Sequence, residues 1–125
     1  MLKILGISAY YHDSAAALLV NGEIIAAVQE ERFSSKKHDD AFPELSIKYC
    51  LQEGELHLSE LDAICYYEKP FLKLERILQS FYDHAPSGFR SFIMAMPIWF
   101  GEKVFLKSRM QKAFKKIDHQ YKSDK

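Results

Sequence analysis

Apolar runs alternate with short polar breaks at the start of the chain. Residues 2–9 and 15–20 are apolar and suit strands, and residues 23–28 form a third run. Asn21-Gly22 separates the second run from the third. This dipeptide favours a type I′ turn, because both central positions of that turn need a positive φ. The pattern therefore predicts an antiparallel β-meander.

Helical spacing follows the meander. Residues 29–42 are polar and dense in charge without a clear period, which indicates a loop. Pro43 opens a predicted helix that Gly54 ends, since proline is tolerated in the first helical turn. The apolar face expected for this helix consists of Leu45, Ile47, Tyr49, Cys50 and Leu51.

The second half of the chain is mostly helical in pattern. Residues 58–62 predict a short capped turn, and residues 63–67 predict a fourth strand. Further helices are expected from Pro70 to a break at residues 85–88, and from about Phe89 to Phe114 with a kink or break near Pro97 and Gly101. Strands followed by a helix, a strand and more helices indicate an α/β fold.

Composition narrows the class of protein. The 125 residues suit one domain or a piece of one, and 17 basic against 17 acidic residues argue against a dedicated nucleic-acid binder. The apolar run 92–100 is far shorter than the ~20 residues of a membrane-spanning helix, and no secretory signal is visible. We therefore expect a cytoplasmic protein without a membrane or nucleic-acid partner.

Cys50 and Cys65 match neither a disulfide framework nor a zinc site, and both are expected to be buried.

The segment from Gly6 to Ala16 contains the first candidate for chemistry. It places His12, Asp13 and Ser14 between small residues, in a loop that can present backbone N–H groups to a phosphate. His12 could act as a general base near neutral pH, with Asp13 orienting it or holding a metal-bound water. Alternatively, Asp13 and Ser14 bind the local backbone of a turn and His12 is a surface residue. The spacing alone favours this alternative.

A second candidate cluster lies in the charged loop, where residues 30–33 and 36–39 read EERF and KKHD. Lysine and arginine suit a phosphate or carboxylate ligand, and Phe33 could anchor the loop by burying its ring. On composition alone, a solvated charged loop is the favoured interpretation.

Together these segments resemble a known family. The string ILGISAYYHDSAAALLVNGEIIAAVQEERFSSKKHDDAFPELSIKYCL resembles the N-terminal signature of the carbamoyltransferases related to nodulation protein NodU and to the antibiotic-tailoring carbamoyltransferases. The later strings YYEKPFLKLERILQSF and GFRSFIMAMPIWFGEKVFLK are similar to the next segments of the chain in one bacterial branch. The resemblance covers about the first 110 of the 125 residues, with the elements in family order.

The resemblance implies a fold and a domain organisation. Residues 1–117 would be the N-terminal part of a ribonuclease-H-like, actin-like ATPase domain, and residues 118–125 a frayed basic tail. This domain is similar to that of the tRNA threonylcarbamoyl-adenosine synthases, and in the family a YrdC-like domain comes after it.

The resemblance also implies a chemistry. Carbamoyl phosphate and ATP would give carbamoyl-adenylate, whose carbamoyl group passes to an acceptor hydroxyl, and a divalent metal is implied in this domain. His12 matches a histidine at the transfer site, so we expect it to be the catalytic base with Asp13 beside it. The residues expected to bind substrate or phosphate are Ser8, Ser14, Arg32, Lys36, Lys37 and His38. No residue of this chain is expected to be a metal ligand.

Two departures from the family limit this expectation. Ser35 stands where the family usually has an arginine. Neither the His-rich metal motif of the family nor its YrdC-like domain is found in this sequence. We therefore expect an N-terminal fragment that is inactive without the remainder of the enzyme. The alternatives are a non-catalytic nucleotide-binding or interaction module, which would bind ATP by itself, and a remnant without activity.

Overall fold

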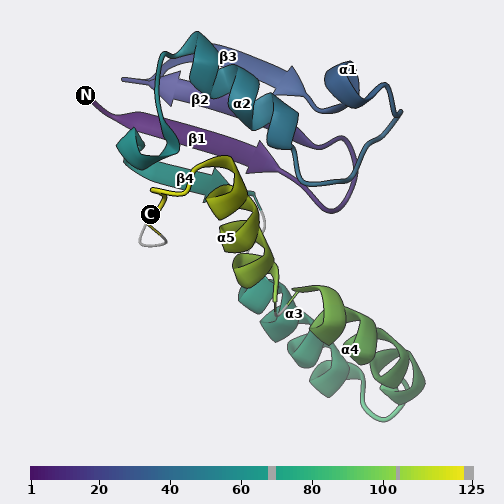
Figure 1. The fold of residues 1–125 in the computed structure, drawn as a ribbon. Coiled ribbons are helices and arrows are strands. Elements are labelled where there is room, and N and C mark those ends of the chain that lie inside the picture. Colours follow the sequence, from purple (N-terminus) through teal and green to yellow (C-terminus); the bar gives the residue numbers. More distant parts are fainter. Residues whose placement is uncertain (68–69, 104, 123–125) are drawn as a thin grey trace. The chain divides into compact units, whose positions relative to one another are not determined.

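A computed structural model describes residues 1–67, 70–103 and 105–122 of the chain. It divides into two compact units, residues 1–67 with 110–125 and residues 68–109, and each is described by itself. The first unit contains a mixed four-stranded sheet in the order β3-β2-β1-β4 (Figure 1). The strands are β1 (Lys3–Ser8), β2 (Ala15–Val20), β3 (Glu23–Gln29) and β4 (Ala63–Tyr66).

The predicted meander is confirmed. Strands β1, β2 and β3 pair antiparallel, and β4 pairs parallel with β1. Asn21 and Gly22 have φ angles of 53° and 88°, the positive values that a type I′ turn needs. The turn is tied to the start of β1, because the Leu2 N–H donates to Asn21 Oδ1 at 2.8 Å. The α/β class predicted from the sequence is therefore present.

Five α-helices and one 3₁₀ turn complete the described elements: α1 (Glu31–Ser34), α2 (Glu44–Glu53), η1 (Leu58–Glu60), α3 (Pro70–His84), α4 (Phe89–Lys103) and α5 (Leu106–Ile117). Helix α1 lies inside the segment predicted to be a loop. Helix α4 continues through Pro97 and Gly101 and ends at Lys103, so the break between α4 and α5 lies close to the place predicted for it. Pro97 has no backbone N–H, so the carbonyl of Ile93 loses its helical hydrogen bond. Ile93 lies in an exposed part of the helix, where water can bind this carbonyl instead.

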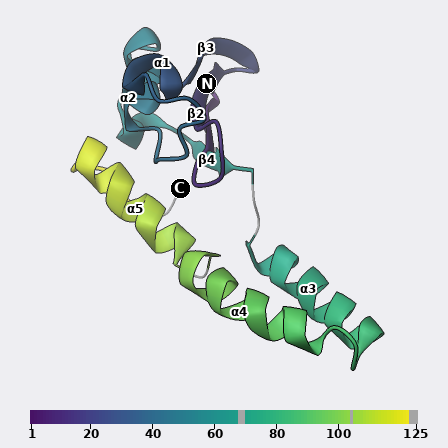
Figure 2. The same ribbon diagram turned by 90° about the vertical axis from the view of Figure 1, so that its right-hand side faces the viewer.

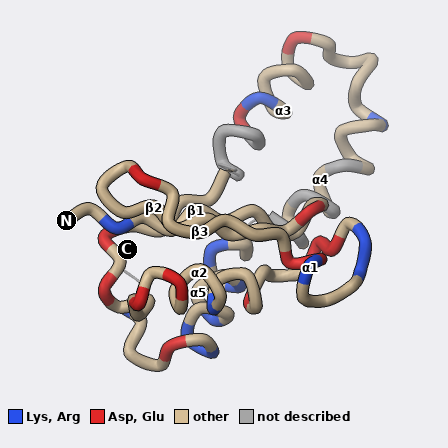
Figure 3. Tube along the Cα trace, turned by 90° about the horizontal axis from the view of Figure 1, so that it is seen from above, with Lys and Arg blue, Asp and Glu red and all other residues tan. Residues whose placement is uncertain are grey.

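The core of the first unit lies on one face of the sheet. Figure 3 shows α2 and α5 on the same side of the strands. The buried side chains of this core cluster are Leu5, Ile7, Ala16, Leu18, Ile47, Cys50, Leu51, Leu58, Leu61, Phe114 and Tyr121. The ring of Phe114 lies 5.2 Å from that of Phe42 and 5.3 Å from that of Tyr121, measured between centroids.

The tail after Ile117 was expected to fray, but Tyr121 is only 5% exposed and belongs to this core. Its backbone N–H also donates to the carbonyl of Asp118 at 3.2 Å. The aromatic contact between Tyr121 and Phe114 gives the tail an apolar anchor that its basic composition does not reveal. Residues 123–125 lie outside the described residues.

Two burial predictions are wrong for geometric reasons. Leu45 and Tyr49 are 45% and 38% exposed, because the buried face of α2 follows positions 46, 47, 50 and 51 at helical spacing. Cys65 is exposed, because its strand neighbours Ile64 and Tyr66 pack against the core and alternation turns it to the opposite face. Cys50 is buried as expected, and this burial raises the pKa of its thiol.

Gly54 permits α2 to approach β2 closely. A Cβ atom at this position would collide with Cδ2 of Leu18, which is fully buried. We expect Gly54→Ala to lower the free energy of unfolding by about 1–3 kcal/mol, the usual cost of overpacking. Urea unfolding measures this change. The matched control is Gly101→Ala in α4, where an added Cβ meets nothing within 4 Å. A Gly54→Ala protein as stable as wild type would contradict the close contact.

The second unit contains the helices α3 and α4, which form a hairpin (Figure 2). The ring of Phe81 stacks on that of Phe92 with centroids 4.4 Å apart and also lies near Phe89. Several large apolar side chains of this unit remain exposed, namely Leu78, Tyr82, Phe89, Ile93, Met94, Phe100 and Phe105. Among the described helices, none combines the length and apolar character needed to cross a membrane.

Candidate functional site

Asp13 joins two histidines at one end of the sheet. It lies in the loop between β1 and β2, and its Oδ2 is 2.9 Å from Nδ1 of His12. Its Oδ1 is 2.9 Å from Nδ1 of His38, which belongs to the loop before α2. An ionised carboxylate can only accept hydrogen bonds, so both Nδ1 atoms carry the proton. In a neutral imidazole this leaves the lone pair on Nε2.

The ionised form of Asp13 is favoured. The hydrogen bond from His38, followed by that from His12, lowers the pKa of this carboxyl, while partial desolvation opposes the shift. Because the folded pKa lies below the ordinary value of 3.8, the contact is fully present above that pH. It is lost only as the pH falls through the lowered folded value. Near neutral pH the carboxylate therefore holds both histidines in the Nδ1–H tautomer.

Backbone hydrogen bonds hold the two loops together. The Tyr10 N–H donates to the carbonyl of Asp40, and the Ser14 N–H donates to the carbonyl of Asp39, both at 2.8 Å. Tyr10, Asp13 and His38 adopt positive φ angles of 66°, 50° and 54°. These left-handed conformations are uncommon outside glycine and turn the loops sharply. The geometry of Asp13 and its two histidines is thus fixed by the backbone as well as by the side chains.

Ser14 is buried beneath this loop, with 1% of its surface exposed. Its carbonyl accepts a hydrogen bond from the Glu30 N–H at 2.8 Å, which ties the start of β2 to the end of β3. Its Oγ has no hydrogen-bond partner in the part of the chain that the structure describes. Ser14 was expected to contact substrate, and the structure places it where it links backbone segments.

Glu30 was not among the predicted site residues, although it organises the second loop. Its carboxylate is 5% exposed and accepts hydrogen bonds from the backbone N–H groups of Leu45 and Ser46 and from the Ser46 hydroxyl, at 3.1, 2.8 and 2.6 Å. It therefore caps the N-terminus of α2 from a distant position in the sequence. The signal was indirect: α2 starts after Pro43 with no local capping side chain, so its first N–H groups need another acceptor.

The two lysines of the charged loop differ in their surroundings. Nζ of Lys36 lies 3.7 Å from Asp39 Oδ1 and 3.4 Å from Asp40 Oδ1. Asp39 is buried, and hydrogen bonds from the Ser34 hydroxyl and the Ala41 N–H lower its pKa. Lys37 is exposed and makes no ion pair with any described residue. The loop thus presents Lys37 to solvent, while Lys36 neutralises neighbouring acids.

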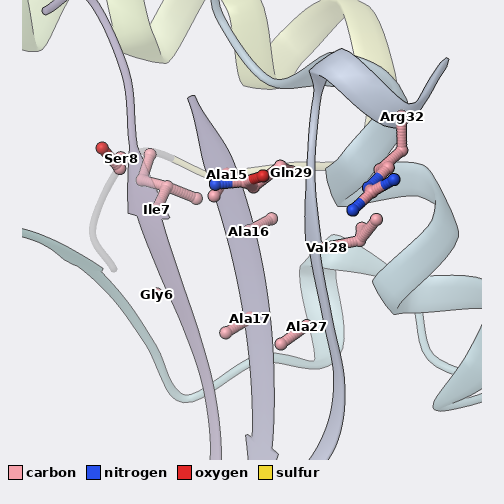
Figure 4. A pocket seen from close by; sticks show the side chains of 10 residues that line it. All are labelled: Gly6, Ile7, Ser8, Ala15, Ala16, Ala17, Ala27, Val28, Gln29 and Arg32. Atoms are coloured by element: carbon pink, nitrogen blue, oxygen red, sulfur yellow. The ribbon is translucent and has the colours of Figure 1, made fainter. Parts of the chain in front are cut away.

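Ser8 and Arg32 lie elsewhere, at a pocket of about 530 Å³ over strands β1, β2 and β3 (Figure 4). Its lining consists of Gly6, Ile7, Ser8, Ala15, Ala16, Ala17, Ala27, Val28, Gln29 and Arg32. The predicted set of substrate-binding residues is therefore divided. His38 joins His12 and Asp13, Ser8 and Arg32 line the pocket, and Lys36 faces acidic side chains.

A divalent metal was expected in the complete domain. Among the side chains that the structure describes, no group of three or more His, Cys, Asp or Glu could hold a metal ion. Asp13 also uses both of its oxygens on imidazoles. The described residues therefore do not form a ligand set for such a metal.

Comparison with known proteins identifies the class. Residues 3–124 match the family model described as the carbamoyltransferase N-terminus. The chain therefore belongs to the carbamoyltransferase family, as its sequence resemblance implied.

Two individual proteins are also similar to the chain. The chain is 55% identical over 117 residues to the uncharacterized protein sll1178 of Synechocystis sp., and the match covers 94% of this chain and 19% of that protein. It is 43% identical over 74 residues to nodulation protein NolNO of Sinorhizobium fredii, covering 57% of this chain and 11% of that protein. The chain thus spans a fifth or less of the length of these two relatives.

Proposed function

We propose that this chain is the N-terminal part of an ATP-dependent O-carbamoyltransferase and belongs to a ribonuclease-H-like, actin-like ATPase domain. Membership of the carbamoyltransferase family supports the reaction class. The antiparallel meander followed, after a helix, by a fourth strand parallel to the first supports the fold. A cytoplasmic location stays a prediction.

The contact of Asp13 with His12 and His38 carries the catalytic part of the proposal. In this proposal, ATP and carbamoyl phosphate supply an activated carbamoyl group as carbamoyl-adenylate, with release of pyrophosphate from ATP and of phosphate from carbamoyl phosphate. Nε2 of His12 takes the proton of the acceptor hydroxyl while that oxygen attacks the carbamoyl carbon. The bond between this carbon and the phosphate oxygen breaks, and AMP leaves. Asp13 stabilises the imidazolium that forms and keeps the ring in the required tautomer.

In this proposal, the exposed side of the charged loop, residues 30–39, contacts the phosphate groups. Lys37 is the lysine of this loop with no ion pair among the described residues, whereas Lys36 already faces Asp39 and Asp40. Lys37 can therefore approach a phosphate group without first losing an internal partner. The described residues offer no group of three or more metal ligands, so the proposal gives none of them a role in metal binding.

Release of pyrophosphate from ATP tests the proposal without knowledge of the acceptor. We expect the full-length gene product to release pyrophosphate only when carbamoyl phosphate is present, because formation of carbamoyl-adenylate requires both substrates. The 125-residue chain alone is the matched control and is expected to be inactive. Absence of this release from the full-length protein would overturn the proposal. Calorimetric binding of ATP by the 125-residue chain, together with that absence, would instead support a non-catalytic nucleotide-binding module.

A further inference from the structure

The pocket over β1, β2 and β3 lies on the face of the sheet that α2 does not cover. Leu5, Ile7 and Leu18 point into the core beside α2. Side chains alternate along a strand, so the intervening residues belong to the opposite face. These residues are Gly6, Ser8, Ala15 and Ala17, and all four line the pocket. The pocket therefore lies on the face opposite the core, and Ile7 and Ala16 belong both to its lining and to the core cluster.

The floor of the pocket is flat and apolar. Glycine at position 6 and alanines at 15, 17 and 27 add at most one carbon to the backbone. A planar ring can approach such a surface closely and displace water from it. The volume of about 530 Å³ lies within the range of small-molecule sites, and it exceeds what a ligand as small as carbamoyl phosphate would fill.

Polar groups gather at one end of this pocket. Figure 4 shows Ser8, Gln29 and Arg32 toward one end, and Gly6, Ala17 and Ala27 toward the other. Arg32 makes no hydrogen bond or ion pair with the described residues, and the described lining contains no acidic side chain. A guanidinium without such partners favours a carboxylate or a single phosphate as its ligand, because it can bind either group through two parallel hydrogen bonds.

The single cation of the described lining, Arg32, also limits how many negative charges the ligand can carry. A nucleoside triphosphate would bring several negative charges to a lining that holds only Arg32 to balance them. The combination of an apolar floor, one cation and two neutral polar side chains instead fits a ring that carries one anionic group and further hydroxyl groups. Ser8 and Gln29 can bind such hydroxyls as donors or acceptors.

The pocket is connected along the chain to the candidate base. Ser8 ends β1 and Ala15 begins β2, and the loop between them carries His12 and Asp13. We propose that the pocket binds the acceptor of the carbamoyl group, and that this acceptor is a ring-bearing alcohol with one anionic group held by Arg32. The identity of the ligand as an acceptor rests on the proposed function, whereas its chemistry follows from the lining.

Titration of the 125-residue chain with 4-(hydroxymethyl)benzoate tests the pocket, because this probe combines a ring, an alcohol and one carboxylate. We expect amide shifts in ¹H–¹⁵N spectra at Gly6, Ser8, Ala17 and Ala27. Arg32→Gln should raise the dissociation constant of the probe about tenfold, since it removes a charge-assisted hydrogen bond. The uncharged probe 4-methylbenzyl alcohol should bind the wild-type chain about tenfold more weakly for the same reason.

Two further variants make the result decisive. Arg90→Gln removes the same charge from an exposed position in α4 and should keep wild-type affinity. Ala27→Leu fills the floor from an exposed position, so it should abolish the shifts while the spectrum stays folded. Equal affinity of Arg32→Gln and Arg90→Gln, shifts at other residues, or no binding by wild type would overturn the proposal.

The pocket and the proposed function can fail separately. Binding at the pocket without pyrophosphate release from the full-length protein would leave the pocket in place and overturn the carbamoyltransferase activity. Pyrophosphate release together with an unresponsive pocket would overturn the acceptor site alone.

Discussion

Replacing His12 by alanine in the full-length protein is expected to lower the rate of carbamoyl transfer by about 100- to 10,000-fold, the range that a positioned general base contributes. Without the imidazole, no group at this position can take the proton as the acceptor oxygen attacks. Pyrophosphate release should continue, because it precedes that proton transfer in the proposed sequence. The two rates, measured side by side, separate a lost base from a lost fold.

Replacing Asp13 by asparagine should impair the same step while preserving the shape of the side chain. The carboxylate of Asp13 presents two acceptors to His12 and His38, whereas the amide of the variant would present one acceptor and one donor. Where the amide NH₂ faces His12, that ring must keep its lone pair on Nδ1 and its proton on Nε2. An Nε2 that carries a proton cannot accept another from the acceptor hydroxyl. Where the NH₂ faces His38, His12 keeps its tautomer but loses the negative charge that stabilises its imidazolium.

His119→Ala provides the control for both variants. His119 is exposed, and no hydrogen bond or ion pair connects it to the described residues. Its loss should leave both transfer and pyrophosphate release unchanged. If His12→Ala transfers the carbamoyl group as fast as His119→Ala, the role given to His12 is wrong.

The elements of the fold that could be predicted are those whose conformation is set by residues adjacent in the sequence. Asn21-Gly22 encodes its own turn, and the apolar runs on either side pair because the turn brings them together. Pro43 and Gly54 likewise mark the ends of α2 through local backbone preferences. Such signals require no knowledge of distant contacts, so the sequence was sufficient to predict these elements.

The site depends on contacts between distant residues, which the sequence did not show. His12 and Asp13 were predicted as neighbours, but His38 was assigned to phosphate binding. It lies 25 positions beyond Asp13, and two loops with left-handed residues bring it there. The prediction that Cys65 is buried was wrong for a related reason. Its apolar neighbours in the sequence indicated burial, but the packing of Ile64 and Tyr66 decided which face of β4 was covered.

Replacing Glu30 by alanine is expected to lower the free energy of unfolding by about 3 kcal/mol, the largest stability effect predicted for this chain. The carboxylate caps α2 with three hydrogen bonds, and its loss leaves the N–H groups of Leu45 and Ser46 and the Ser46 hydroxyl without this acceptor. Ser46 is fully buried, so water cannot easily replace the carboxylate there.

Urea unfolding measures this loss, and hydrogen exchange at Ser46 shows whether the first turn of α2 opens. Glu53→Ala is the matched control, because Glu53 is an exposed acid at the other end of the same helix, where negative charge is unfavourable. Equal unfolding midpoints for the two variants would contradict the capping role. A selective loss in Glu30→Ala would also link stability to the site. The same loop that reaches α2 carries His38, so an uncapped helix should loosen the contact between His38 and Asp13.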